Sequence, residues 1–462
     1  MFAVLVAFTS YWTVLDAEGL EDNSANRRPL IEEQKVPRGL LLARDGTVLA
    51  RSRGKGSGDD RVYSRFYPTG PLFSHEVGYS FIERGRSGLE QSYDDDLAGR
   101  EDEFQSVLSG LENRDREGKD VVTNLDPKAQ RAAISALAGR RGSIVAIEPQ
   151  TGKVRVMVSI PDYDPNQIPD RFSELNRAEG SPLLNRATQA RYQPGSTFKV
   201  VTAAAALDTG KFTPDSVVDG SSPKTISGTP LSNAGGESFG PVSLTDALTN
   251  SVNTVWAQVG ERLGKGTLYK YMQRFGFNQK PPLDYPPQQM DASGVFGGGN
   301  LLTENDSVDI GRVAIGQERL QVTPVQMAMV AATIAAGGRL FKPRFVDRIV
   351  RKDGRVQRRI EPDLQSQVMS KKAADQLTQM MGRVVEEGTG TAAALSGIRV
   401  AGKTGTAEVA NGTANQAWFI AFAPIDRPRM AIAATVERTS GQGGTVAAPM
   451  AKQVLEVLVK GS

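Results

Sequence analysis

The sequence contains no cysteine, which excludes disulfides, thiolate nucleophiles and cysteine-ligated metal ions. Histidine is almost as scarce, because His75 is the single example in 462 residues. One histidine cannot build a histidine-based metal site, and His75 lies far along the chain from every candidate nucleophile. We therefore expect His75 to be a packing or surface residue. Any catalytic site must move its protons with another residue type.

A strong net charge and a long hydrophobic run are also missing. Lys and Arg total 55 against 52 Asp and Glu, a net charge of +3, and no basic stripe is interleaved with aromatic residues. Nucleic-acid binding is therefore not expected. Residues 1–15 are mostly apolar, but a membrane-spanning helix needs roughly 20 such residues. With Tyr11 and Trp12 near its end, we interpret this run as a truncated single-pass membrane anchor, with a buried N-terminal helix as the alternative.

The chain divides by composition into four segments. After the anchor at 1–15, residues 16–36 are polar and irregular, as in a stalk or linker. Residues 37–119 predict an irregular β-rich pedestal domain, which starts with a hairpin at 37–52 that turns at Asp45-Gly46. From residue 120 to 462 the predicted elements are longer, and we assign this part to one catalytic domain.

The catalytic domain is predicted to have an α+β fold. Two strands surround a Pro-Gln-Thr-Gly turn in 142–160, and three more follow one another near the C-terminus. Together they predict a five-stranded antiparallel sheet flanked by helices, with an all-helical subdomain inserted into it. The three late strands are expected at 399–410, 417–424 and 429–437, and the main helices at 120–137, 196–208, 244–264, 323–338 and 448–461.

The stretch "RYQPGSTFKVV" places Ser196 at the start of an apolar helix and Lys199 one turn later on the same face. Apolar surroundings disfavour the charged ammonium and would lower the pKa of Lys199, so the amine could take the Ser196 proton. The helix N-terminus would offer N–H groups to a developing oxyanion. An ordinary snorkelling lysine is the alternative, since S-x-x-K also occurs in loops, at Ser52/Lys55 and Ser221/Lys224.

Two further motifs follow in order. "TNSVNT" contains Ser251, whose hydroxyl could relay a proton, and Asn253, whose amide could hold a peptide group. Helix capping is the alternative, and the same S-x-N spacing recurs at 24–26. "AGKTGTAE" at 401–408 is the only K-T-G of the chain, on a predicted strand along which a peptide could add.

Side chains of the K-T-G segment suit an anionic peptide. Lys403, Thr404 and Thr406 would supply a cation and two hydroxyls to a carboxylate, and Gly405 has no side chain to obstruct a second backbone. A solubilised edge strand is the alternative.

The order S-x-x-K, S-x-N, K-T-G is that of penicillin-binding proteins and class A β-lactamases. The sequence resembles a class B penicillin-binding protein, a monofunctional peptidoglycan D,D-transpeptidase, over about residues 37–462. The stretches "RGLLLARDGTVLA", "GRSGLE", "EPQTGKVRVMVSIPDYDPN", "NRATQARYQPGSTFK", "IGQERLQVTPVQMA", "AWFIAFAP" and "GGTVAAPMAK" carry the same resemblance. The sequence departs from the family pattern at Asn415-Gln416, where many relatives have a histidine, and at Glu318, where glycine is common.

The resemblance implies a serine acyl-enzyme mechanism. Ser196 would attack the penultimate D-Ala carbonyl of a stem peptide ending in D-Ala-D-Ala, with Lys199 as general base. Ser251 would help return the proton to the leaving amine. The backbone N–H groups of Ser196 and Thr406 would form the oxyanion hole, and an amine of a neighbouring stem peptide would resolve the ester as a cross-link.

For the rest of the site, the resemblance implies that Asn253 binds the substrate amide, while Lys403, Thr404 and Thr406 hold the terminal carboxylate beside Gly405. No cofactor or metal is implied. β-Lactam antibiotics would acylate the same serine.

Outside the site, the resemblance implies a catalytic domain on the extracytoplasmic side of the cell membrane. Residues 37–119 are too few and too β-rich for a glycosyltransferase, so the implied partner is a multipass membrane glycan polymerase of the cell-shape and cell-division type. D,D-carboxypeptidase activity, β-lactam hydrolysis and a non-catalytic β-lactam sensor remain as alternative functions.

Overall fold

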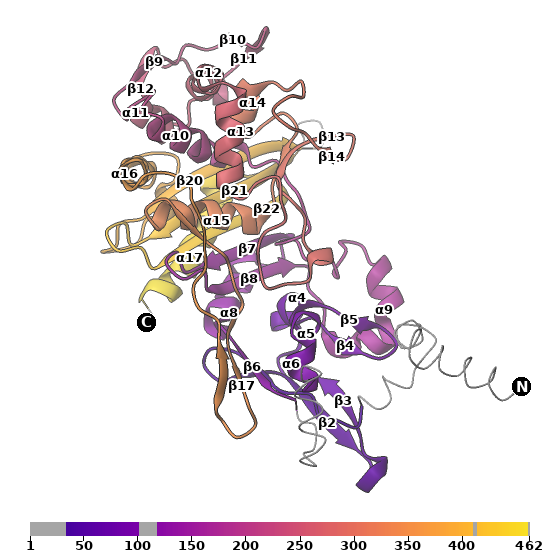
Figure 1. Cartoon of the computed structure of the whole chain (residues 1–462). Coiled ribbons are helices and arrows are strands. Elements are labelled where there is room, and N and C mark those ends of the chain that lie inside the picture. Colours follow the sequence, from indigo (N-terminus) through magenta and orange to yellow (C-terminus); the bar gives the residue numbers. More distant parts are fainter. Residues whose placement is uncertain (1–33, 101–117, 410–413, 461–462) are drawn as a thin grey trace, which may run out of the picture.

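The computed structural model describes residues 34–100, 118–409 and 414–460 (Figure 1). The predicted membrane anchor and most of the predicted stalk lie outside these ranges. Within the described ranges, no helix has both the length and the apolar character required to cross a membrane.

A five-stranded antiparallel sheet forms the centre of the molecule (Figure 1). Its order is β20-β21-β22-β7-β8, so the two strands around the Pro-Gln-Thr-Gly turn join the three late strands as predicted. β20 is an edge strand. The bounds are β7 Gly142–Ile147, β8 Val154–Ile160, β20 Ala401–Val409, β21 Ala414–Ala423 and β22 Met430–Thr439.

Helices cover both faces of this sheet. Successive residues of β22 enter different cores, since Ala431 and Ala433 pack on one side and Ile432 and Ala434 on the other. Both faces are therefore buried, which explains the nearly continuous apolar run "MAIAATV". α8 (Pro127–Leu137) and α17 (Ala448–Lys460) lie on one face, and α15 (Pro324–Ala335) and α16 (Lys371–Glu386) lie on the other.

The insertion above the sheet is helix-rich, but it is not all-helical. The short strand pairs β9–β12 and β10–β11 and a three-stranded sheet of β13, β14 and β15 accompany the helices. The helix expected at 244–264 is two helices, α11 (Leu244–Thr249) and α12 (Asn253–Leu263), separated at Ser251. The helix expected from residue 196 begins as a 3₁₀ turn, η5 (Gly195–Phe198), and becomes α10 (Lys199–Asp208).

Several further elements belong to the catalytic domain outside its central sheet. They are α9 (Ile168–Arg177), α13 (Lys265–Arg274), α14 (Ile310–Ala314), β9 (Val217–Asp219), β10 (Lys224–Ile226), β11 (Thr229–Leu231), β12 (Pro241–Ser243), β13 (Gly294–Gly297), β14 (Asn300–Leu301), β15 (Leu320–Gln321), β16 (Arg339–Phe341) and β19 (Leu364–Gln367).

The N-terminal module is built on a six-stranded sheet of order β18-β17-β6-β1-β2-β3. The predicted hairpin is present, and Gly46 has φ 86° in its turn. Three strands come from beyond residue 119, so the predicted boundary at 119/120 does not coincide with the sheet's edge. The bounds are β1 Leu41–Leu42, β2 Val48–Lys55, β3 Val62–Phe66, β6 Asp120–Thr123, β17 Val346–Val350 and β18 Val356–Arg359.

The module also contains three short helices that its turn-rich sequence did not predict. They are α4 (Ser74–Val77), α5 (Gly88–Ser92) and α6 (Asp94–Ala98), accompanied by the strand pair β4 (Ser80–Phe81) and β5 (Gly85–Arg86). His75 lies on α4, is 5% exposed and packs edge-on against Tyr163. It is therefore a packing residue, and burial lowers its pKa to about 4.

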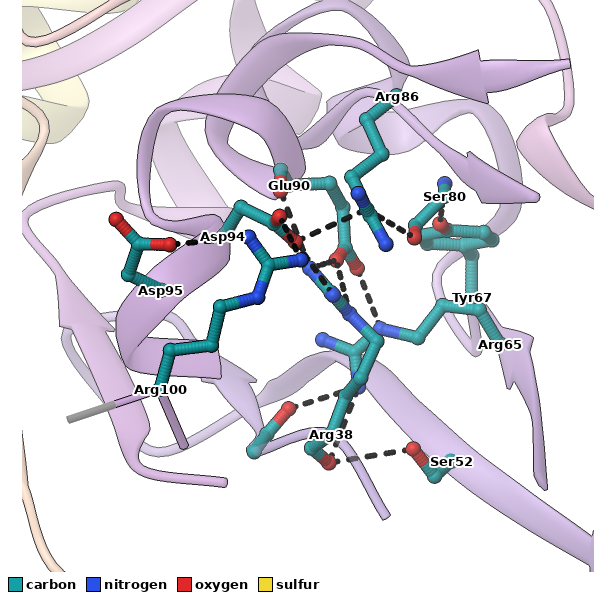
Figure 2. A network of polar contacts seen from close by, with 11 residues as sticks. Arg38, Ser52, Arg65, Tyr67, Ser80, Arg86, Glu90, Asp94, Asp95 and Arg100 are labelled. Atoms are coloured by element: carbon teal, nitrogen blue, oxygen red, sulfur yellow. Dashed lines mark hydrogen bonds and ion pairs between the residues drawn. The ribbon is translucent and has the colours of Figure 1, made fainter. Parts of the chain in front are cut away.

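A buried ion cluster joins the elements of this module (Figure 2). The Glu90 carboxylate, which is fully buried, accepts hydrogen bonds from Arg65 Nε at 2.5 Å and from Arg38 Nη2 at 3.0 Å. Asp94 pairs with Arg38 Nη1 at 2.6 Å and with Arg86 Nε at 2.9 Å. These contacts tie β3 and the segment before β1 to helices α5 and α6.

Candidate active site

The turn that contains Ser196 packs directly against β20. Gly195 has φ 52°, and its N–H donates to the Gly316 carbonyl at 3.0 Å. A Cβ on Gly195 would lie 2.7 Å from Thr406 O, and one on Gly405 would lie 2.6 Å from Pro194 O. Both contacts are closer than a side chain tolerates. Gly405, predicted to leave room for a substrate backbone, thus makes room for the turn that contains Ser196.

Lys199 begins α10 and is fully buried. Its Nζ lies 2.7 Å from the Ser251 carbonyl, 2.7 Å from Asn253 Oδ1 and 3.2 Å from Ser251 Oγ. A neutral amine has two N–H groups for the two nearer oxygens, and its lone pair then remains for a hydroxyl. The Ser196 hydroxyl has no hydrogen-bond partner among the described residues, so it is not engaged by any competing acceptor there.

Ser251 occupies the break between α11 and α12, where it links two lysines. Its φ of 59° is unusual for a non-glycine residue, and its side chain contacts both Lys199 and Lys403. Ser251 Oγ lies 2.9 Å from Lys403 Nζ and 3.2 Å from Lys199 Nζ. S-x-x-K, S-x-N and K-T-G, which are distant in sequence, therefore meet in one hydrogen-bonded chain.

The two lysines are buried without a negative partner. Neither Lys199 nor Lys403 forms an ion pair with any residue that the structure describes, and both are 0% exposed. Burial, and then the nearby Lys403 ammonium, hold the pKa of Lys199 well below its usual range. Burial lowers the pKa of Lys403 to about 7. At neutral pH the site can therefore hold a neutral Lys199 beside a Lys403 that is partly charged.

The hydroxyls of Thr404 and Thr406 are the remaining polar groups of the K-T-G strand. Because alternate residues of a strand point to the same side, Thr404 and Thr406 share a face. Thr404 Oγ1 is 2.7 Å from Thr389 Oγ1, and Thr406 Oγ1 accepts a hydrogen bond from Gly443 N–H at 3.1 Å. The proton of the Thr406 hydroxyl thus remains available for an anion.

The alternative motifs do not form comparable sites. Ser52 and Lys55 lie on β2 in the N-terminal module, where Ser52 Oγ donates to the Arg38 carbonyl. Ser221 donates to Asp219 at 2.5 Å, and Lys224 pairs with the same carboxylate. The remaining S-x-N, at 24–26, lies outside the described residues.

Both departures from the family pattern have a structural context. Gln416 is buried on β21 and donates to Thr435 Oγ1 at 2.6 Å. Glu318 has φ 63°, a conformation that glycine adopts most easily, which accounts for glycine being common there. The Glu318 carbonyl accepts a hydrogen bond from the side chain of Gln193, three residues before Ser196.

Several residues that support the site were not singled out from the sequence. Thr389 and Gly443 contact the threonines of K-T-G, and a Cβ on Gly443 would lie 2.4 Å from Gly405 O. Asn253 Nδ2 donates to the Ser232 carbonyl at 3.1 Å, which orients its oxygen towards Lys199. Of these supporting residues, only Gly443 lies in a stretch that the sequence analysis quoted, "GGTVAAPMAK". That stretch indicated the family and not the role of the residue.

Known families match most of the chain. Residues 142–456 match the family described as penicillin binding protein transpeptidase domain. The chain belongs to this family. Residues 38–121 match the penicillin binding protein A dimerisation domain. The predicted family, the α+β fold and the serine D,D-transpeptidase class are therefore confirmed.

Full-length relatives support the same conclusion. The peptidoglycan D,D-transpeptidase PbpA of Mycolicibacterium smegmatis is 34% identical over 489 aligned positions, which cover 100% of this chain and 96% of the relative. The stage V sporulation protein D of Bacillus subtilis is 32% identical over 85% of this chain and 63% of its own length. A ceftriaxone acyl-enzyme complex of penicillin-binding protein A from M. tuberculosis superposes with a TM-score of 0.83 at 32% identity, covering 93% of this chain and 100% of that one.

Proposed function

We propose that Ser196 is the nucleophile of this penicillin-binding protein and that Lys199 activates it. The observation that supports this assignment is the uncompensated burial of Lys199, which favours a neutral amine next to the S-x-N hydroxyl. A neutral amine can accept the Ser196 proton, whereas an ordinary surface lysine would be protonated.

The substrate is the D-Ala-D-Ala end of a peptidoglycan stem peptide. Ser196 Oγ bonds to the penultimate D-Ala carbonyl carbon while its proton passes to Lys199. The backbone N–H groups of Ser196 and Thr406 stabilise the oxyanion. The C–N bond then breaks, the proton returns through Ser251 to the leaving amine, and free D-Ala departs. An acceptor amine attacks the ester, forms the cross-linking amide and restores the Ser196 hydroxyl.

The terminal carboxylate determines how the donor peptide lies. Thr404 and Thr406 present hydroxyls from one face of β20. The Lys403 ammonium, which donates to Ser251 Oγ and to the Thr404 carbonyl, adds positive charge that attracts the carboxylate. Asn253 would bind the substrate amide. β-Lactams place a strained amide and a carboxylate in the same relation, so we expect them to acylate Ser196.

We place the catalytic domain outside the cytoplasmic membrane, anchored through residues 1–15. Neither of the two matched families is a glycan polymerase. Glycan strands would therefore come from a multipass membrane polymerase of the cell-shape or cell-division type, acting as a partner.

Intact-protein mass spectrometry after incubation with benzylpenicillin tests the assignment, with Ser196→Ala as the matched control. We expect one stable adduct on the wild type and none on the variant. An adduct that disappears while the drug is consumed would indicate a β-lactamase. The absence of any adduct on folded protein would favour a non-catalytic scaffold.

A second measurement separates transpeptidation from D,D-carboxypeptidation. Donor stem peptide is incubated with and without a D-amino acid as the acceptor amine. An exchanged product shows transfer to an amine, whereas shortened peptide alone shows transfer to water and would overturn the transpeptidase assignment.

A further inference from the structure

The outer face of the β2–β3 hairpin pairs cations on β2 with two apolar side chains and a serine on β3. On β2, Arg51, Arg53 and Lys55 point to the same side. Their partners across the ladder are, in order, Phe66, Ser64 and Val62. This pattern is amphipathic along the hairpin, and it occurs on a face that the folded module leaves open to solvent.

The cations of this face are exposed, and their charge is not neutralised in place. Arg51, Arg53 and Lys55 form no ion pair with any residue in the described part of the chain, and neither does Arg61, whose guanidinium lies over Gly54 and Tyr63 on the opposite side of the hairpin. The guanidinium of Arg53 lies 3.0 Å from the centroid of the Phe66 ring. Between residues 51 and 61 the four basic residues outnumber the two acidic ones, at 59 and 60, so this segment carries a net charge of +2.

The inner face of the same hairpin is fixed to the module. Ser52 Oγ donates to the Arg38 carbonyl at 3.2 Å, and Arg65 is held by Glu90 and by the Gly39 carbonyl at 2.7 Å (Figure 2). The hairpin extends away from the five-stranded sheet at the opposite end of the molecule (Figure 1). Its outer face is therefore presented rigidly and far from the catalytic cleft.

The described chain also starts at this hairpin. The Tyr63 N–H on β3 donates to the Gln34 carbonyl at 2.8 Å. The apolar run of the sequence ends at Leu15, and the stretch from Leu15 to Gln34 spans at most about 65 Å when fully extended. An anchor at residues 1–15 would therefore hold the hairpin within about 65 Å of the bilayer, a range that includes direct contact.

We propose that the outer face of the β2–β3 hairpin binds the surface of an anionic phospholipid bilayer. The inference rests on the membrane location proposed above. The basic side chains contact lipid phosphates, while Phe66 and Val62 lie at the level of the headgroups. Val62 is 38% exposed, so its side chain is accessible to a surface that approaches this face. Such contact would orient the catalytic cleft away from the membrane.

The expected strength follows from the number of charges. Each basic residue near an anionic surface adds about 1 kcal/mol of attraction, equivalent to roughly fivefold in affinity. The two acidic residues of the turn oppose part of this attraction. Replacing all four cations by glutamine should therefore weaken hairpin contact at least about tenfold, and salt should weaken wild-type contact in the same direction.

The experiment uses the natural absence of cysteine. Ser57→Cys, at the tip of the hairpin, gives the full chain a unique site for an environment-sensitive fluorophore. The labelled chain is reconstituted into phosphatidylcholine vesicles with or without about one third phosphatidylglycerol. We expect a blue shift and quenching by lipid-borne spin labels only in the anionic vesicles. A label at Lys372→Cys on α16 should not respond to lipid charge.

Matched charge variants complete the test. The hairpin variant carries Arg51→Gln, Arg53→Gln, Lys55→Gln and Arg61→Gln, and it should lose the signal. The control variant removes four exposed cations of the catalytic domain, through Arg262→Gln, Lys270→Gln, Lys372→Gln and Arg427→Gln, and it should keep the signal.

A label that stays in water on anionic vesicles would overturn the proposal, as would a control variant that loses the signal equally. Contact with an acidic protein instead of lipid would give the first of these results. Penicillin acylation of both variants should equal that of the wild type. Flotation of the vesicles reports membrane association separately, so a failure of the anchor is distinguishable from a failure of the hairpin.

Discussion

Two regions of this molecule bury cations, and they treat the charge in opposite ways. In the catalytic cleft, Lys199 and Lys403 are 0% exposed, and neither has a carboxylate partner among the described residues. In the N-terminal module, the side chains of Arg65 and Arg38 are 1% and 9% exposed, and both contact the buried carboxylate of Glu90. The cleft leaves positive charge uncompensated, whereas the module compensates it.

The difference follows from the chemistry of the two side chains. A lysine can lose its proton when burial makes the charge costly, and the neutral amine is then a base. A guanidinium stays charged, so an arginine can be buried only with acceptors and counter-charge. Burial in the cleft therefore generates reactivity, and burial in the module holds the elements together.

The largest expected effect is on the acylation rate, when Lys199 is replaced by a residue that cannot lose its proton. Lys199→Arg keeps the approximate length, but its guanidinium stays charged and cannot act as a base at any working pH. We expect acylation by a fluorescent penicillin to fall at least about a thousandfold. Stopped-flow or gel-based acylation rates measure this directly.

The control for this variant is Lys372→Arg, an exposed lysine on α16, which should acylate at the wild-type rate. Circular dichroism establishes that both variants fold. Substantial acylation by folded Lys199→Arg would show that another group removes the Ser196 proton.

In the N-terminal module, the change that tests how buried cations are compensated is Glu90→Gln. It leaves Arg65 and Arg38 buried without their shared negative partner, which should lower the free energy of unfolding by about 3–5 kcal/mol. Denaturant unfolding measures the loss. The folded fraction should still be acylated normally, because the cluster lies outside the cleft.

Asp95→Asn is the matched control, since the Asp95 side chain is 80% exposed and pairs with Arg100 at the surface. Its effect should stay below about 1 kcal/mol. Equal destabilisation by Glu90→Gln and Asp95→Asn would refute the distinction between buried and exposed pairs.

The catalytic fold was predictable because its signals are local. β7 and β8 surround a turn that the sequence marks, and β22 is apolar throughout because both faces of the central sheet are covered. The six-stranded sheet was not predictable as a whole. Its β17 pairs with β6, more than 200 residues earlier, and no local pattern records such a pairing.

The candidate site was likewise predictable only where its signals are local in sequence. The three motifs identified Ser196, Lys199 and Ser251 because each motif is contiguous in sequence. Their placement depends on a 3₁₀ turn at 195–198 and on the positive φ of Ser251, which helical periodicity does not predict. Thr389 acts only through its contact with β20, so nothing in its own segment indicates the role.

Glu76 extends the comparison to a buried acid. It is 1% exposed on α4, and its carboxyl accepts a hydrogen bond from Gln130 Nε2 at 2.6 Å without forming an ion pair with any described residue. Burial raises its pKa to about 8. Because the folded pKa exceeds the unfolded value of 4.5, the unfolded state loses this proton first, and stability falls as pH rises from 4.5 to 8.

Glu76→Gln should therefore stabilise the protein by about 3 kcal/mol at pH 7 and by almost nothing at pH 4. Thermal unfolding at the two pH values measures the difference. Stabilisation that is equal at both pH values would indicate better packing rather than relief from a titrating carboxyl.

The last expected effect concerns the charge of Lys403. Its pKa of about 7 means that the ammonium is lost above neutrality, and with it the attraction for the carboxylate of a penicillin. Acylation of the wild type should therefore decline towards pH 9, by up to about tenfold per pH unit. Lys403→Arg keeps its charge, so its rate should be lower in absolute terms yet flat across this range. A pH profile of the second-order acylation rate distinguishes the two cases. If the wild type were also flat, the carboxylate would be held by the threonine hydroxyls of β20 without help from the Lys403 charge.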